Sequence, residues 1–220
     1  GQQGREPGDA PEQGDRAEDH PEVLRADGYK DAFINDRLMY ERFSVPQSGC
    51  LRRPLFMGSG RGMGGSGSIN AMVYLRGSAA DFRAWDHPTW SWTAVEPAFA
   101  AIERTLEVRR RPPTEFTEAV IEAADTAGFH RQHDLNDGEL LGGLGYEWMN
   151  YRDDERRNAY TGFVQPHLDR PNLVVLTGAA VQRLVFDDRR RLTGVEFIHE
   201  GARHTARVRR EAILCAGALE

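Results

Sequence analysis

The sequence predicts a mixed α/β chain in which helices come first and a cluster of strands follows. Two stretches, 93–106 and 114–128, carry apolar residues every three or four positions, which is typical of amphipathic helices. After Pro171-Asn172 the pattern changes to short β-branched or alternating runs, which are typical of strands. Between the ends of the chain lies one dense turn signal, six glycines within residues 58–67. No internal repeat is visible.

The individual elements follow from local signals. Residues 79–86 predict a short helix that carries Phe82 and Trp85. Thr93 and Glu96 have the spacing of a capping box, and Pro97 would then lie in the first helical turn, where a missing N–H is tolerated. The apolar face of that helix and of the next one, which Thr114 can cap and Gly128 can end, consists of Val95, Phe99, Ile102, Leu106, Phe116, Val120, Ile121 and Ala124.

The second half of the chain is rich in loops before it becomes rich in strands. Residues 130–170 contain five glycines, four of them within 138–145, and a short helix is predicted over 158–169. Asp187-Asp188 and Glu200-Gly201 are turn signals between strands. The predicted strands are 173–176, 181–186, 195–199, 202–208 and 212–215.

Charge divides the chain into two parts. Residues 1–27 hold eight acidic residues and three arginines, and the remaining residues hold 26 acidic and 25 basic ones. Because apolar residues are scarce at the start, we expect 1–27 to be a disordered acidic tail, with 1–25 mobile on the nanosecond timescale. The nearly neutral body over 28–220 argues against non-specific nucleic-acid binding.

Composition excludes several classes of protein. Of the 220 residues, 40% are hydrophobic and 28% are charged, as in ordinary globular proteins. No apolar run approaches the ~20 residues of a membrane-spanning helix, and the polar start shows no secretory signal. The two cysteines, Cys50 and Cys215, are too few for a disulfide framework and favour a reducing, cytoplasmic location.

The glycine-rich segment is the main functional candidate. A flexible surface linker is one interpretation, but Met57, Met63 and the apolar run after Ile69 disfavour it. Gly60 to Gly65 also matches the GxGxxG pattern of nicotinamide-binding Rossmann proteins. That fingerprint needs a preceding strand, and Pro54 argues against one. Glycines can also point several backbone N–H groups at an anion.

A longer pattern is more specific. Residues 60–74, which read GRGMGGSGSINAMVY, resemble the first signature of the glucose–methanol–choline (GMC) flavin oxidoreductases. Further positions along the chain also carry residues similar to those of that family. They are Arg76-Gly77, Asp81-Phe82, the tryptophans at 85, 90 and 92, Asp134 to Asn136, Gly143 to Tyr146, the run from Pro171 to Thr177 and the run from Arg210 to Ala218. The resemblance covers about 28–220, with the signature at 58–77, a helical insert over 79–170 and the strand cluster over 172–218.

The resemblance implies part of a Rossmann-like FAD-binding domain with part of a substrate domain. It further implies an FAD-dependent alcohol dehydrogenase or oxidase of the choline dehydrogenase type, which oxidises the CH–OH group of a small alcohol by hydride transfer to flavin. The cofactor-binding residues that it implies are Gly64, Gly65, Ser66, Asn70, Ala71, Met72, Val73, Val181, Ala216 and Gly217. Of these, Asn70 would donate a hydrogen bond towards the reduced ring and Val181 would present its backbone to the adenine. Alternatively, Asn70 could be a turn or helix-cap residue, and Val181 could be an ordinary core valine.

The departures from the family pattern matter as well. No opening GxGxxG strand is visible, and the family's catalytic histidine lies beyond its second signature, so we expect no catalytic residue in this segment and no activity from it alone. Another chain could supply the remaining parts. The alternative function is a non-catalytic scaffold or assembly module. Some relatives attach FAD through a histidine at the position of Ile69, so the resemblance predicts non-covalent FAD here.

We expect no metal site. His130, His133 and Asp134 have a spacing that could suggest one, but no further ligand cluster accompanies them. A surface loop with incidental histidines is the favoured interpretation.

Overall fold

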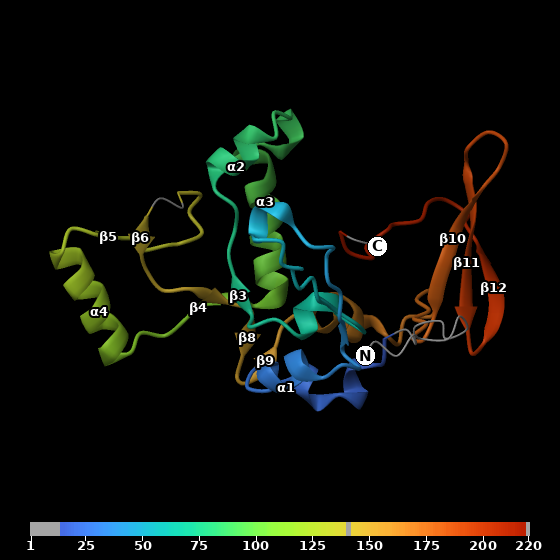
Figure 1. The fold of residues 1–220 in the computed structure, drawn as a ribbon, viewed down its shortest axis with the longest axis horizontal. Coiled ribbons are helices and arrows are strands. Elements are labelled where there is room, and N and C mark those ends of the chain that lie inside the picture. Colours follow the sequence, from blue (N-terminus) through green and yellow to red (C-terminus); the bar gives the residue numbers. More distant parts are fainter. Residues whose placement is uncertain (1–13, 140–141, 219–220) are drawn as a thin grey trace.

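The computed structural model describes residues 14–139 and 142–218. A central body carries two extensions: a lobe built around α4 on one side and a three-stranded sheet, β10 to β12, on the other (Figure 1). Helices and strands are mixed, and the long strands come last, so the predicted fold class is confirmed.

The first described residues, 14–27, pack against the body. The expectation of a disordered tail over 1–27 is therefore wrong for residues 14–27. They form two 3-10 turns, Ala17–Asp19 and Pro21–Val23, ahead of α1 (Tyr29–Ile34). Ala17 and Val23 are only 3% and 2% exposed. Residues 1–13 lie outside the described part of the chain. Ala17 and Val23 join one buried cluster with Ala32, Leu38, Met39, Ile69 and Tyr160.

Polar contacts explain why so acidic a segment folds. Tyr160 donates a hydrogen bond from its hydroxyl to the Glu18 carboxylate. His20 is buried and lies 2.8 Å from the Asp15 carboxylate. These hydrogen bonds help to offset the entropy lost when the segment becomes ordered. Composition does not reveal the first of them, because Tyr160 is distant from Glu18 in the sequence.

Short strands hold the central body together. β1 (Met39–Tyr40) pairs with β2 (Ser59–Gly60), and a 3-10 turn, Ser48–Cys50, lies between them in the chain. β7 (Trp148–Met149) pairs antiparallel with both β3 (Val73–Tyr74) and β4 (Arg109–Arg110). β8 (Tyr151–Arg152) and β9 (Glu155–Arg156) form a hairpin directly after β7.

The helical region follows the prediction with one shift. Ser78 and Asp81 form a capping box at the start of α2 (Ala79–Ala84), and a 3-10 turn, Pro88–Trp90, follows. Helix α3 spans Trp92–Leu106 with Ser91 at its N-cap, so the predicted cap at Thr93 is wrong. Because the helix begins earlier, Pro97 lies in its second turn, where one backbone hydrogen bond is lost.

The α4 lobe exposes most of its predicted inner face. α4 (Glu115–Thr126) starts where Thr114 accepts a hydrogen bond from the N–H of Thr117 at 3.1 Å. Ile121 is 4% exposed, but Phe116 is 80% exposed, so the helix buries only part of its apolar face. Nearby, β5 (His130–Arg131) pairs in parallel with β6 (Gly143–Leu144). The helix predicted over 158–169 is a π-helical turn, Tyr160–Val164, and a 3-10 turn, Gln165–His167.

The late strands form one antiparallel sheet in the order β10–β11–β12. These strands are Ala180–Phe186, Leu192–His199 and Ala202–Arg207, joined at the two predicted turns. Residues 173–176 and 212–215 are not strands, although their residue types favour that state. A strand requires a hydrogen-bonded neighbour, and within the described residues neither segment has one.

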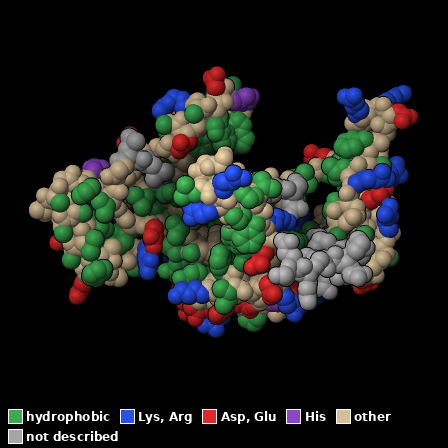
Figure 2. Space-filling model, viewed as in Figure 1, with side chains coloured by type: hydrophobic (Ala, Val, Ile, Leu, Met, Phe, Trp, Pro, Cys, Tyr) green, Lys and Arg blue, Asp and Glu red, His purple; other side chains and the backbone are tan. Residues whose placement is uncertain are grey.

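The chain exposes far more surface than a compact monomer. Its accessible surface is 16,336 Å², against about 10,000 Å² expected for a compact protein of its mass, 24.7 kDa. Ile213 and Val174 are 81% and 79% exposed. Figure 2 shows hydrophobic side chains at the surface of both the central body and the α4 lobe. No helix among the described residues is long and apolar enough to span a membrane.

Candidate functional site

The glycine-rich segment is a packed turn, which excludes the linker interpretation. β2 leads into Gly62 and Gly64, whose φ angles are +119° and +87°, and a 3-10 turn, Gly65–Ser68, follows. A Cβ atom on Gly64 would lie 2.4 Å from the Ser68 hydroxyl. Only glycine fits at such a position. Ser66 accepts a hydrogen bond from the N–H of Gly60 at 2.9 Å, which closes the turn.

The buried side chain of Asn158 holds this turn from the interior of the protein. Its side-chain amide donates to the Ser68 hydroxyl at 2.9 Å, and Ser68 in turn donates to the carbonyl of Met63 at 2.6 Å. Asn158 also caps the following helical turn, because its Oδ1 accepts from the N–H groups of Tyr160 and Thr161. The glycine turn and the start of the π-helical turn are therefore held as one unit.

The residues after the turn alternate between the interior and the surface. Met72 is buried, with φ at +62°, and its carbonyl accepts from the N–H of Asn150 at 3.0 Å. Asn70 and Ala71 are exposed, and Val73 is 55% exposed at the start of β3. The side chains of 70, 71 and 73 are thus available to a ligand, whereas Met72 contributes only its backbone.

Arg156 lies beneath Asn70 and is 1% exposed. Its Nη1 donates to three oxygens: the Gly67 carbonyl at 3.1 Å, the Asn70 carbonyl at 2.7 Å and Asn70 Oδ1 at 2.9 Å. Burial lowers the pKa of its guanidinium to about 10, so Arg156 stays charged at neutral pH. No local sequence pattern marks this residue as part of a site.

Tyr160 completes the buried polar layer behind the turn. Burial, together with the hydrogen bond to Glu18, raises the pKa of the Tyr160 phenol to about 12. The hydroxyl therefore remains a donor across the physiological range. This contact ties the N-terminal segment to the same unit that holds the glycine turn.

A largely apolar pocket of about 400 Å³ opens beside Asn70. One wall is α1 and the other is the end of the glycine signature. Its lining consists of Tyr29, Lys30, Phe33, Ile34, Ile69, Asn70 and Ala71. A few polar groups at the edge of an apolar cleft are typical of small-molecule sites.

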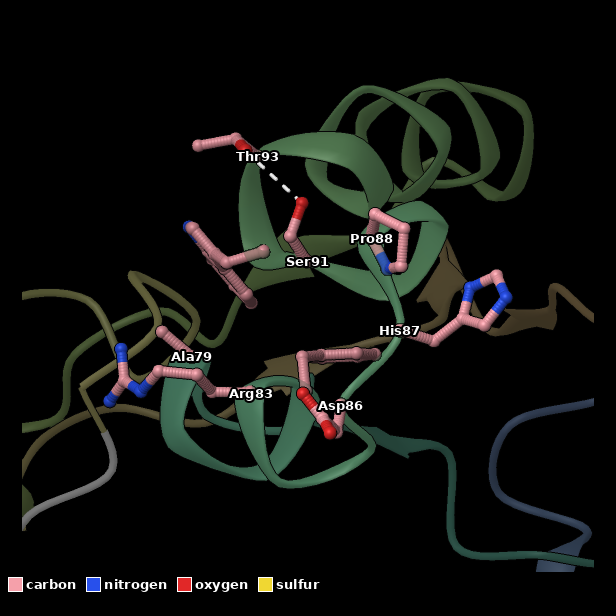
Figure 3. A pocket seen from close by; sticks show the side chains of 9 residues that line it. Ala79, Arg83, Asp86, His87, Pro88, Ser91 and Thr93 are labelled. Atoms are coloured by element: carbon pink, nitrogen blue, oxygen red, sulfur yellow. Dashed lines mark hydrogen bonds between the residues drawn. The ribbon is translucent and has the colours of Figure 1, made fainter.

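A second cavity, of about 460 Å³, lies between α2 and α3 (Figure 3). Phe82 and Trp92 contribute aromatic surface to it, with ring centroids 6.0 Å apart. Arg83 and His87 extend to opposite sides of this cavity in Figure 3, so these two side chains do not converge on one point. None of the residues predicted to bind a cofactor lines it.

The other predicted cofactor residues belong to later segments of the chain. Val181 is 60% exposed on β10, where it pairs with Phe197. Ala216 and Gly217 are exposed in the segment that leaves β12 and runs back towards the centre of the molecule (Figure 1). Gly64, Gly65, Ser66 and the residues 70–73 form one local unit. The segment before β10 is joined to it through Gly14, which lies against Gly62 and accepts a hydrogen bond from the N–H of Gly178 at 3.4 Å.

The described residues, 14–139 and 142–218, contain neither a candidate metal site nor a disulfide. Those ranges contain no group of three or more His, Cys, Asp or Glu side chains placed to hold a metal ion. Cys50 and Cys215 are free thiols.

The comparisons with known proteins define the class. The sequence matches the GMC oxidoreductase family over residues 44–220, and the chain belongs to that family. It is 33% identical over 202 residues to the mitochondrial choline dehydrogenase of Mus musculus, which covers 84% of this chain and 34% of that protein. It is 31% identical over 197 residues to the oxygen-dependent choline dehydrogenase of Burkholderia thailandensis, covering 79% and 34%. The chain thus spans about a third of the length of these relatives.

Solved structures share the fold. Pyridoxine 4-oxidase from Mesorbium loti superposes with a TM-score of 0.75 at 24% identity, over 85% of this chain and 40% of that one. A formate oxidase superposes with a TM-score of 0.74 at 18% identity, over 90% and 39%. At such identities the likeness concerns the fold alone.

Proposed function

We propose that this chain forms the flavin-ring side of an FAD-dependent oxidoreductase that oxidises a small alcohol. The pocket beside Asn70 and Ala71 carries the proposal, because it combines apolar walls with a polar edge and lies at the end of the glycine signature. Its volume of about 400 Å³ falls in the range of small-molecule pockets. The choline dehydrogenases among the relatives support an alcohol as the substrate class.

The residues present fit a flat ring system. Gly65 has open space where a side chain would lie, so nothing there obstructs a ligand, and the exposed Ala71 occupies little of the pocket. Asn70 offers a side-chain amide at the rim. The backbone of Val181 would contact the adenine of FAD. The small residues Ala216 and Gly217 would let the last segment of the chain pass close to the cofactor. When bound, FAD would accept the hydride from the alcohol carbon.

This chain's own contribution is binding and orientation. The turn fixes the backbone of Gly64 to Ser66, the wall of α1 excludes water from one side of the pocket, and Asn70 presents a polar group at its edge. None of the residues that line the pocket is a histidine or a carboxylic acid, the usual bases for the hydroxyl proton.

A titration tests the proposal. FAD is added to the 220-residue protein, and the flavin absorbance and fluorescence are followed. Ala71→Phe should abolish saturable binding by filling the pocket. The matched control is Ala98→Phe, an exposed alanine on α3. The proposal is wrong if FAD fails to bind, or if both variants bind it equally well; a folded chain that binds no flavin would favour the scaffold alternative.

A further inference from the structure

Arg156 is a buried cation without a carboxylate partner among the described residues. It is 1% exposed, and no ion pair involving it occurs in that part of the chain. Burying a charged group away from water is costly unless hydrogen bonds compensate. Its Nε and Nη2 atoms are buried without partners in the described structure, so Nη1 makes all of its recorded side-chain hydrogen bonds.

All of those bonds go to one short segment. Nη1 reaches the carbonyls of Gly67 and Asn70 and the side-chain oxygen of Asn70, residues that lie 86 to 89 positions earlier in the chain. The guanidinium therefore bridges Gly67 and Asn70 and fixes the backbone where the chain leaves the glycine turn. Hydrogen bonds from a charged donor are stronger than neutral ones.

The same contact determines which way the Asn70 amide faces. Oδ1 accepts from two donors, Arg156 Nη1 at 2.9 Å and the N–H of Met72 at 3.1 Å. In the flipped amide, the NH₂ group would face two donors and lose both bonds. Oδ1 consequently points inward, and Nδ2 is left on the side of the exposed pocket rim.

We propose that Arg156 is a positioning residue, which holds the Asn70 amide so that Nδ2 donates to a ring acceptor of the ligand bound beside Ala71. This inference rests on the proposed function for the identity of the ligand as flavin. The orientation of the amide, by contrast, is a property of the ligand-free chain and can be measured without flavin.

The ligand-free test is NMR on the ¹⁵N-labelled 220-residue protein. We expect nuclear Overhauser contacts between the Arg156 Hη1 protons and Asn70, and a single, rigid orientation of the Asn70 side-chain amide. Absence of those contacts, or a freely rotating amide, would overturn the inference. Because this measurement uses the wild-type protein, it decides the matter even if a substitution at Arg156 prevents folding.

The second test is a double-mutant cycle read out as FAD affinity. Arg156→Met keeps the length of the side chain and removes its charge and donors. We expect it and Asn70→Ala each to weaken FAD binding about tenfold. The double variant should be no weaker than Arg156→Met alone, since both changes remove the same contact. Arg156→Lys should restore part of the affinity.

Arg152→Met is the matched control, because Arg152 lies on the same hairpin but pairs with Glu107 at 2.6 Å, away from the glycine turn. It should leave FAD affinity within twofold of wild type. Additive losses at Asn70 and Arg156 would mean that Arg156 only stabilises the fold, and would overturn the inference. If wild type binds no FAD, the proposed function fails, while the NMR measurement still decides the role of Arg156.

Discussion

The guanidinium of Arg156 donates to both the carbonyl and the side-chain oxygen of Asn70, at 2.7 and 2.9 Å. Through this pair, the β8–β9 hairpin fixes the end of the glycine turn, which lies far from it in the sequence. The turn is therefore held in shape before any ligand binds. Such preorganisation lowers the entropic cost of binding.

Gly64→Ala should destabilise the chain by about 2–3 kcal/mol, because it combines a positive φ with a collision at Ser68. Two matched variants separate these causes. Gly201 has a φ of +74° but open space around it, so Gly201→Ala should cost about 1 kcal/mol. Gly49→Ala meets neither problem and should change stability by no more than about 1 kcal/mol. Urea denaturation measures all three; equal losses would contradict the packing of the turn.

Acid should weaken the attachment of the N-terminal segment. The hydrogen bond from His20 lowers the pKa of Asp15, and for Glu18 the hydrogen bonds from Tyr160 and others outweigh the opposing effect of burial. Carboxyl groups with lowered pKa values stabilise the fold above their unfolded values, 3.8 and 4.5, and lose that contribution as the pH falls through the lower folded values.

Denaturation midpoints between pH 6 and about pH 3 test this expectation. Wild type should lose stability across the lower half of that range, and Glu18→Gln should lose less. An identical pH dependence in the two proteins would show that the contact between Glu18 and Tyr160 does not contribute.

Several features followed from local sequence. The glycine turn, α2, α4 and the hairpin turns at 187–188 and 200–201 arise from residues a few positions apart, and all are present. The features that were missed depend on distant partners. Residues 173–176 and 212–215 have strand-like side chains without a paired neighbour in the described chain, and Glu18 folds its segment through Tyr160, 142 positions away.

The candidate site shows the same division. The signature residues from Gly64 to Val73 could be found from the sequence because their pattern is local. Arg156 could not, since an arginine in an Arg-rich chain gives no signal until the fold buries it under Asn70. Where Val181 lies relative to the turn likewise depends on how β10 packs, which the local pattern does not determine.

Any flavin bound here should be non-covalent. Ile69 stands at the attachment position of some relatives and is 5% exposed within the core, and residues 58–73 contain no His, Cys or Tyr. After acid precipitation of the FAD-loaded protein, the yellow colour should remain in the supernatant. Colour retained by the washed pellet would contradict this prediction.

The 220-residue chain with excess FAD should not turn over primary alcohols. The pocket lining offers no histidine or carboxylate to take the hydroxyl proton, and general-base catalysis contributes roughly 10²–10⁴-fold. A panel of alcohols with an artificial electron acceptor provides the assay. Turnover that Asn70→Ala abolishes would show that this chain carries a complete catalytic site.

The central claim is that flavin binds against the end of the glycine signature, and a hydrogen-exchange footprint tests it most directly. Amide exchange is compared in the presence and absence of saturating FAD. We predict slower exchange over 64–73 and over α1, with no change over α4 or in the cavity between α2 and α3. Protection confined to that second cavity, or bound FAD that leaves 64–73 unprotected, would contradict the account.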